Sequence, residues 1–163
     1  MKNKISLPDL DPTDLRMLAL LQDDATLSSA ALGEQLSLSV TPAWRRRKHL
    51  EELGVIRGYR ANLDRRMLGY GVMAFVQVRF EGHANDAPDR FEALVKTLPQ
   101  VLTCHKVTGE ADYVLTVLAR DLDDYGDFVE HVLRRQPGVA AIQSSLSLRE
   151  VKYETRVPLD SGT

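Results

Sequence analysis

The sequence has a single cysteine, Cys104, and no apolar run of the roughly 18 residues that span a bilayer. One thiol can form neither an internal disulfide nor a cysteine-based metal site, so a reducing, cytoplasmic setting is the default expectation. The first ten residues lack the apolar stretch of a secretory signal. Because the chain also lacks a glycine-rich phosphate loop, a G-x-S-x-G elbow and histidines at metal-ligand spacing, we expect no catalytic residues, no metal, no cofactor and no membrane partner.

Charge is nearly balanced overall, at a net −2, but it is unevenly distributed along the chain. Residues 1–66 hold 11 Lys and Arg against 9 Asp and Glu, whereas residues 67–163 hold 10 against 14. The 163 residues, 44% hydrophobic and 27% charged, are typical of one large or two small globular domains. The asymmetry suggests an N-terminal part that binds a polyanion and a C-terminal part with another task.

Three short helices are predicted in the N-terminal part. Asp11 and Pro12 indicate the start of the first helix, within residues 10–24, and Ser28 caps the second. A third helix, residues 41–53, is capped by Ser39 or Thr41 and ends at Gly54. The tight turn between the last two helices is typical of a helix-turn-helix unit, which places its second helix in the major groove of DNA.

The third helix carries a run of basic residues that are too many to be buried together. We expect this helix and the chain after it to contact double-stranded DNA through Ser39, Thr41, Arg45, Arg46, Arg47, Lys48, His49 and Arg57. The alternative is a solvated helix with a chance basic run. Residues 55–64 alternate enough to be a strand, either one whose arginines touch the DNA backbone or a plain linker.

The C-terminal part is predicted to contain four strands and two helices in the order βαββαβ, which is the ferredoxin-like arrangement. The strands are expected at residues 71–80, 101–108, 112–120 and 139–153, and the helices at 88–99 and 121–136. The helices cover one face of the sheet. The other face keeps apolar residues such as Met73, Phe75, Val114 and Leu118, so we expect a second subunit to cover it.

These features together resemble the Lrp/AsnC family over residues 10–158. The resemblance rests on the helix-turn-helix with its Thr-Pro helix start, the stretch LEELGVIRGY, the βαββαβ domain and the turn VTGEADYVL. It implies an α+β protein with a winged helix-turn-helix domain followed by a ferredoxin-like sensor domain. The expected boundaries are 1–54, 55–66 for a linker strand, and 67–163. It also implies a sequence-specific transcriptional regulator that forms dimers and often octamers, and whose C-terminal domain senses an amino acid.

The turn between the second and third predicted strands is the candidate effector site. Gly109 leaves backbone amides open to a carboxylate, and Glu110 or Asp112 could accept an α-ammonium group. By the resemblance, the pocket lies between dimers. The full candidate set is Gly109, Glu110, Asp112, Tyr113, Ser144 and Ser145. The alternative is an ordinary hairpin turn with solvated acids.

Two residues of the third helix stand out. Arg47 occupies a position that is normally aliphatic in the family, so its stem could pack on the core while its guanidinium reaches phosphate, or the helix could be rotated. Trp44 lies beside the predicted buried stripe and is expected to pack there, with contact to a DNA base as the alternative. The second candidate function is a ferredoxin-like oligomeric binding protein or small enzyme, but assembly would not need the basic run at residues 45–48.

Overall fold

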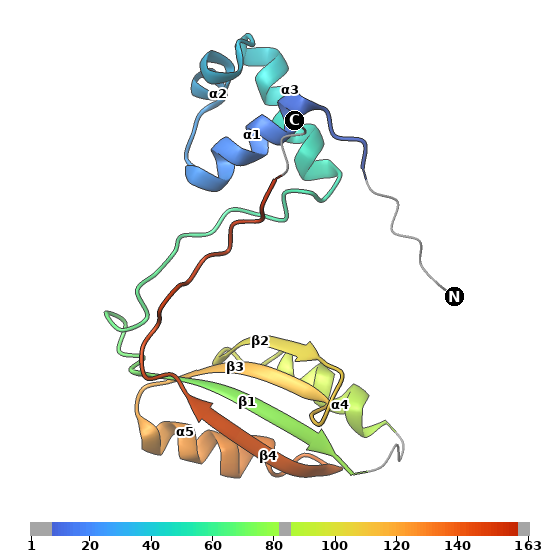
Figure 1. The fold of residues 1–163 in the computed structure, drawn as a ribbon, viewed down its shortest axis with the longest axis vertical. Helices are drawn as coiled ribbons and strands as arrows, with labels where there is room; N and C mark the ends of the chain where they lie inside the picture. Colours follow the sequence, from blue (N-terminus) through green and yellow to red (C-terminus); the bar gives the residue numbers. More distant parts are fainter. Residues whose placement is uncertain (1–7, 82–85, 160–163) are drawn as a thin grey trace. The chain divides into compact units, whose positions relative to one another are not determined.

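The computed structural model describes residues 8–81 and 86–159, which form two compact units (Figure 1). One unit comprises the described residues up to Asn62 together with those from Tyr153, and the other runs from Leu63 to Lys152. No helix in the described ranges is long and apolar enough to cross a membrane. The functional boundaries expected from the sequence, at residues 54 and 66, stay predictions.

The first unit contains the three predicted helices, α1 (Pro12–Asp23), α2 (Ser29–Leu36) and α3 (Val40–Glu52). Asp11 starts α1 with a reciprocal capping box, and the hydroxyl of Ser28 accepts the Ala31 amide in the first turn of α2. Gly54 lies just beyond α3 with φ of 72°, a conformation that glycine adopts without strain. The buried core of this unit consists of Met17, Leu18, Leu21, Leu32, Leu36, Ala43 and Leu50. The trihelical prediction is therefore confirmed.

Residues 156–159 pack on the trihelical part of the chain. The side-chain amide of Gln22 donates to the Val157 carbonyl at 3.1 Å and accepts from the Val157 amide at 2.7 Å. Arg156 forms an ion pair with Asp23, and Leu159 packs against the trihelical core. Residues far apart in the sequence thus belong to one compact unit.

The predicted strand at residues 55–64 is absent. The segment is irregular and exposed, with only Val55 and Ile56 partly buried against the helices. Gly58 has φ of 150°, and the Ile56 amide donates back to the carbonyl of Leu50, the last buried residue of α3. The prediction was wrong because alternation alone does not make a strand: the backbone also needs a partner strand with which to bond.

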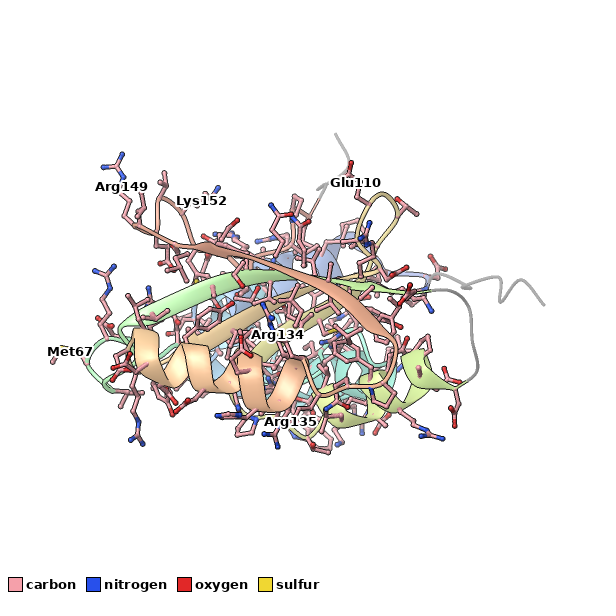
Figure 2. The ribbon with its side chains drawn as sticks, turned by 90° about the horizontal axis from the view of Figure 1, so that it is seen from below. Met67, Glu110, Arg134, Arg135, Arg149 and Lys152 are labelled. Carbon is pink, nitrogen blue, oxygen red and sulfur yellow. The ribbon has the colours of Figure 1, made fainter. Side chains whose placement is uncertain are left out.

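The second unit has the predicted βαββαβ order. Its elements are β1 (Val72–Phe80), α4 (Ala87–Val95), β2 (Val101–Lys106), β3 (Tyr113–Ala119), α5 (Leu122–Phe128), a π-helical turn (Val129–Leu133) that continues α5, and β4 (Val139–Leu146). The strands form one antiparallel sheet in the order β2-β3-β1-β4. Both helices lie on the same side of the sheet (Figure 2), as expected for a ferredoxin-like domain.

The last strand and the first helix of this unit end well before the residues predicted for them. The last strand was predicted to reach residue 153, but β4 ends at Leu146, opposite Ala74, because β1 begins only two residues before Ala74. The helix predicted at 88–99 ends at Val95, since Pro99 has no amide hydrogen and its ring would clash with the carbonyl four residues earlier.

Strand alternation divides the sheet into a core face and an open face. Ala74, Val76 and Val78 are fully buried against the helices, whereas Phe75 between them is 44% exposed. Met73, Val114, Thr116 and Leu118 share the open face with Phe75 through their cross-strand pairs and are half-buried. Among the described residues of this unit, neither helix covers that face, which agrees with the expected apolar surface.

Candidate DNA-binding and ligand-binding sites

Helix α3 is held by a tight turn after α2. Ser37 ends α2 in the left-handed conformation, with φ of 57°. Gly33 packs so closely against this turn that a Cβ there would lie 2.6 Å from the Leu38 carbonyl oxygen. Ser39 occupies the N-cap position of α3, but its side chain forms no capping hydrogen bond. Of the two caps that the sequence offered, Ser39 is the residue at which the helix starts, but its hydroxyl does not form the capping hydrogen bond expected of it.

The exposed part of the basic run is smaller than the sequence suggested. Thr41, Arg45, Lys48 and His49 are exposed on α3, and Arg57 is exposed beyond it. Lys48 lies 3.9 Å from the Glu51 carboxylate, too far for a strong ion pair at a solvated position. These five predicted DNA-contacting residues are accessible to a polyanion.

Arg46 does not lie on the outer side of α3, contrary to expectation. Its Nη1 contacts the carboxylates of Asp11 at 2.6 Å and Asp14 at 2.7 Å. Asp14 is the one buried charged residue among those described, with 6% exposure. The Asp14 amide, and then Arg46, lower the pKa of Asp11 below its ordinary value, while the two carboxylates raise the pKa of Arg46. Arg46 therefore joins α3 to the start of α1.

Arg47 packs toward its own domain as well. Its Nη1 donates to the Leu27 carbonyl at 3.0 Å, and its Nε donates to the Tyr59 hydroxyl at 2.9 Å. The guanidinium carbon lies 4.5 Å from the Tyr59 ring centre, and Glu51 accepts from both Arg47 and the Tyr59 hydroxyl. The side chain is only 21% exposed, and its guanidinium contacts groups of the same domain, whereas from the sequence we expected it to reach phosphate. Burial and then Glu51 raise the pKa of Tyr59.

Trp44 is not a core residue. It is 54% exposed and forms one wall of a groove of about 250 Å³, together with Ser29, Arg47, Lys48 and Glu51. The expectation of packing was wrong because Trp44 lies one position beyond Ala43, and a step of 100° around the helix carries it off the buried stripe. Helical periodicity was the signal that could have placed it.

Comparison with known proteins gives the same two parts. The model of a winged helix-turn-helix DNA-binding domain matches residues 10–57, and that of the Lrp/AsnC ligand binding domain matches residues 73–157. The chain belongs to the Lrp/AsnC family. It is 40% identical to the Bkd operon transcriptional regulator of Pseudomonas aeruginosa, over 94% of this chain and 100% of that one. It is 37% identical to the DNA-binding transcriptional activator DecR of Escherichia coli, over 93% and 99%.

A solved relative has the same fold. A transcriptional regulator from Neisseria meningitidis, crystallised in complex with L-Met, is 38% identical, with a TM-score of 0.89 over 93% of this chain and 98% of that one. As a member of the Lrp/AsnC family, this chain is a DNA-binding transcriptional regulator with a helix-turn-helix domain and a ligand-binding domain.

In this Lrp/AsnC chain the predicted effector turn, between β2 and β3, is open at its tip and tied down at its base. Gly109 has φ of 116° with open space around it, and Glu110 lies exposed at the tip (Figure 2). Asp112 is different: its Oδ2 accepts the Phe80 amide at 2.7 Å, and its own amide donates to the Val78 carbonyl at 3.0 Å. Its carboxylate thus fastens the turn to the end of β1, which the sequence did not predict.

The remaining predicted effector residues, Tyr113, Ser144 and Ser145, do not form one site within a single chain. Tyr113 is buried against α4, where its hydroxyl donates to Glu92 at 2.6 Å, and burial raises its pKa well above the ordinary value. Ser144 pairs across the sheet with buried Val76 and accepts the Tyr125 hydroxyl on the helix side. Ser145 pairs with Phe75 on the open face. Alternation along β4 therefore directs Ser144 and Ser145 to opposite faces.

A second cavity, which the sequence did not predict, lies at the other end of the β2–β3 hairpin. It measures about 380 Å³ and is lined by Tyr70, Pro99, Gln100, Leu118, Ala119, Arg120, Asp124 and Phe128. Asp124 already accepts the Arg120 amide at 2.8 Å, so one of its oxygens is occupied. The lining comes from four separate segments, and no local pattern could have brought them together.

Proposed function

We propose that this chain binds operator DNA through the exposed face of α3 and that an amino acid bound to its second unit changes this binding or the assembly of subunits. The observation that carries the DNA part is the exposed set on α3, Thr41, Arg45 and Lys48, opposite the buried Ala43 and Leu50. A helix with one packed and one cationic face suits the major groove between phosphate strands.

The open face of the sheet supports a proposed dimer. Phe75 is 44% exposed amid half-buried apolar neighbours, and Leu102 on the outer strand β2, at the irregularity in its pairing with β3, is 50% exposed. A second copy that lays the same face against it would remove this apolar surface from water. Higher assembly, such as an octamer, belongs to the same proposal and follows from the family resemblance.

For the effector, we propose an amino acid bound at the tip of the β2–β3 turn, at an interface between dimers. Gly109 and Glu110 offer accessible backbone and a carboxylate there, whereas Asp112 is already engaged by Phe80. The complex of the Neisseria relative with L-Met and the naming of other relatives as leucine-responsive support testing methionine and leucine first.

Binding to duplexes that cover the DNA upstream of the chain's own gene tests the proposal, measured by fluorescence anisotropy from about 50 to 200 mM salt with and without each amino acid. We expect log affinity to fall linearly with log salt, because cationic residues that contact phosphate release counterions. We also expect one amino acid to raise the melting temperature and to change the affinity or the mass of the complex. Equal binding to every duplex under all conditions would contradict it.

A further inference from the structure

Two large apolar side chains lie in the open on α3. Val40 is 55% exposed and Trp44 is 54% exposed. They are four residues apart, so they lie one turn from each other on the same side of the helix. A bulky exposed pair is unfavourable in water, and it lies in the first five residues of α3, the part of a recognition helix that reaches base edges.

The surroundings of this pair are cationic. At 3.6 residues per turn, Val40, Thr41, Trp44, Arg45 and Lys48 lie within an arc of about 140°. Arg45 and Lys48 are exposed beside the two apolar side chains. Glu51 and Glu52 fall in the same arc at the C-terminal end of α3, where Glu51 accepts from Arg47 and the Tyr59 hydroxyl. An apolar strip with positive edges is complementary to the major groove, where thymine methyl groups line the floor and phosphates line both walls.

The guanidinium groups of Arg46 and Arg47 are bound within the protein and are therefore not free to contact DNA bases. Arg46 is bound to Asp11 and Asp14, and Arg47 is bound to Leu27, Glu51 and Tyr59. Of the consecutive arginines on α3, this leaves Arg45 as the one that is fully accessible. Base discrimination by α3 therefore has fewer arginine donors available than the sequence suggested, whereas the Trp44 side chain is 54% exposed.

Resting on the proposed DNA-binding function, we propose that Trp44, with Val40, recognises thymine methyl groups in the major groove and so sets the base specificity of α3. Arg45 and Lys48 contact the flanking phosphates and supply affinity that does not depend on sequence. Trp44 is the only tryptophan in the chain, so its fluorescence reports on this contact directly.

The experiment starts by selecting duplexes from a random 20-base-pair library with the full-length wild-type chain. Each thymine of the selected duplex is then replaced singly by deoxyuridine, which removes the 5-methyl group and keeps the base pairing. We expect one or two replacements in each half-site to weaken binding about fourfold, since each buries one methyl group fewer. Trp44 emission should change, and acrylamide quenching should fall, on the selected duplex but not on a scrambled one.

The variants Trp44→Ala and Leu53→Ala complete the test. Leu53 is a matched control, because it is an apolar residue, 43% exposed, at the C-cap position of the same helix. Trp44→Ala should weaken the selected duplex about fivefold or more, leave the scrambled duplex and the salt slope unchanged, and abolish the effect of deoxyuridine. Circular dichroism checks that each variant is folded, and the deoxyuridine series needs no variant.

The outcomes separate two failures. If no duplex is selected, the proposed DNA-binding function fails and this inference fails with it. If a duplex is selected but deoxyuridine has no effect at any position, or if Trp44→Ala weakens scrambled and selected duplexes alike, the inference alone is overturned. The inference would also be overturned if acrylamide still quenched Trp44 fluorescence in the complex with the selected duplex. That result would favour a protein partner for this surface.

Discussion

The contact of Arg46 with Asp11 and Asp14 gives a prediction that separates structural from DNA-contacting arginines on α3. Arg46→Ala removes the cation that lies 2.7 Å from the Asp14 carboxylate, whose side chain is only 8% exposed. The backbone amide of Asp11, at 3.1 Å, is then the hydrogen-bond donor that remains to Asp14. A buried carboxylate without its counter-charge destabilises the first unit.

The size of the effect follows from the exposure of the partners. Loss of a hydrogen bond between charged groups costs about 1.5–3 kcal/mol. Breaking a fully buried pair costs more, about 3–5 kcal/mol, but Arg46 is 30% exposed and Asp11 is 47% exposed, so water screens part of the interaction. We therefore expect a loss of about 2 kcal/mol, which lowers the melting temperature of a unit of this size by about 10 °C.

The assay is thermal unfolding of the full-length chain, followed by the fluorescence of Trp44, which lies on α3 and so reports on the first unit. The matched control is Arg45→Ala, because Arg45 is the neighbouring, exposed arginine. Arg45→Ala should leave the melting temperature unchanged and reduce the salt slope of DNA binding by about 1. In a chain that already carries Asp14→Asn, Arg46→Ala should lower the free energy of unfolding clearly less than it does in the wild type.

The reasoning would be refuted by equal melting temperatures for Arg46→Ala and Arg45→Ala. It would also be refuted if Arg46→Ala lowered the salt slope while the fold stayed intact, because Arg46 would then contact phosphate. Acid gives an independent check. The Asp11 pKa is lowered in the fold, so its contribution is present above the unfolded pKa, about 3.9, and is lost as pH falls through the folded value. The stability gap between wild type and Arg46→Ala should therefore narrow below about pH 4.

Three further predictions concern other contacts. Arg47→Leu should destabilise the first unit by about 1–2 kcal/mol and so lower its melting temperature, because it removes the internal hydrogen bonds of the guanidinium. An unchanged or raised melting temperature would show that these hydrogen bonds contribute nothing to stability. Asp112→Ala should destabilise the second unit by about 1–2 kcal/mol, because the Phe80 amide loses its acceptor, while Asp112→Asn should largely restore it in urea unfolding followed by circular dichroism. Phe75→Glu should convert dimers into monomers in light scattering, whereas Leu122→Glu, on an exposed helix position, should not.

The sequence by itself determined the elements whose causes are local. Asp11 and Pro12 start α1, and Ser28 starts α2, because a cap acts within one turn of its own helix. The alternation in residues 72–80 fixed which side of β1 is buried, since side chains in a strand alternate whatever its neighbours are. The order of these elements was enough to indicate both the helix-turn-helix unit and the ferredoxin-like sheet.

Only the tertiary structure decided which charges are free. Arg46 finds its partners 32 and 35 residues away, and Asp112 finds the Phe80 amide 32 residues away, at distances in sequence over which no spacing rule applies. Strand ends were decided in the same way: β4 stops near the start of β1, and residues 55–64 form no strand because alternation supplies side chains but not the opposing backbone. Local patterns therefore established what the elements are, and long-range pairing established which of their side chains remain available to DNA or to a ligand.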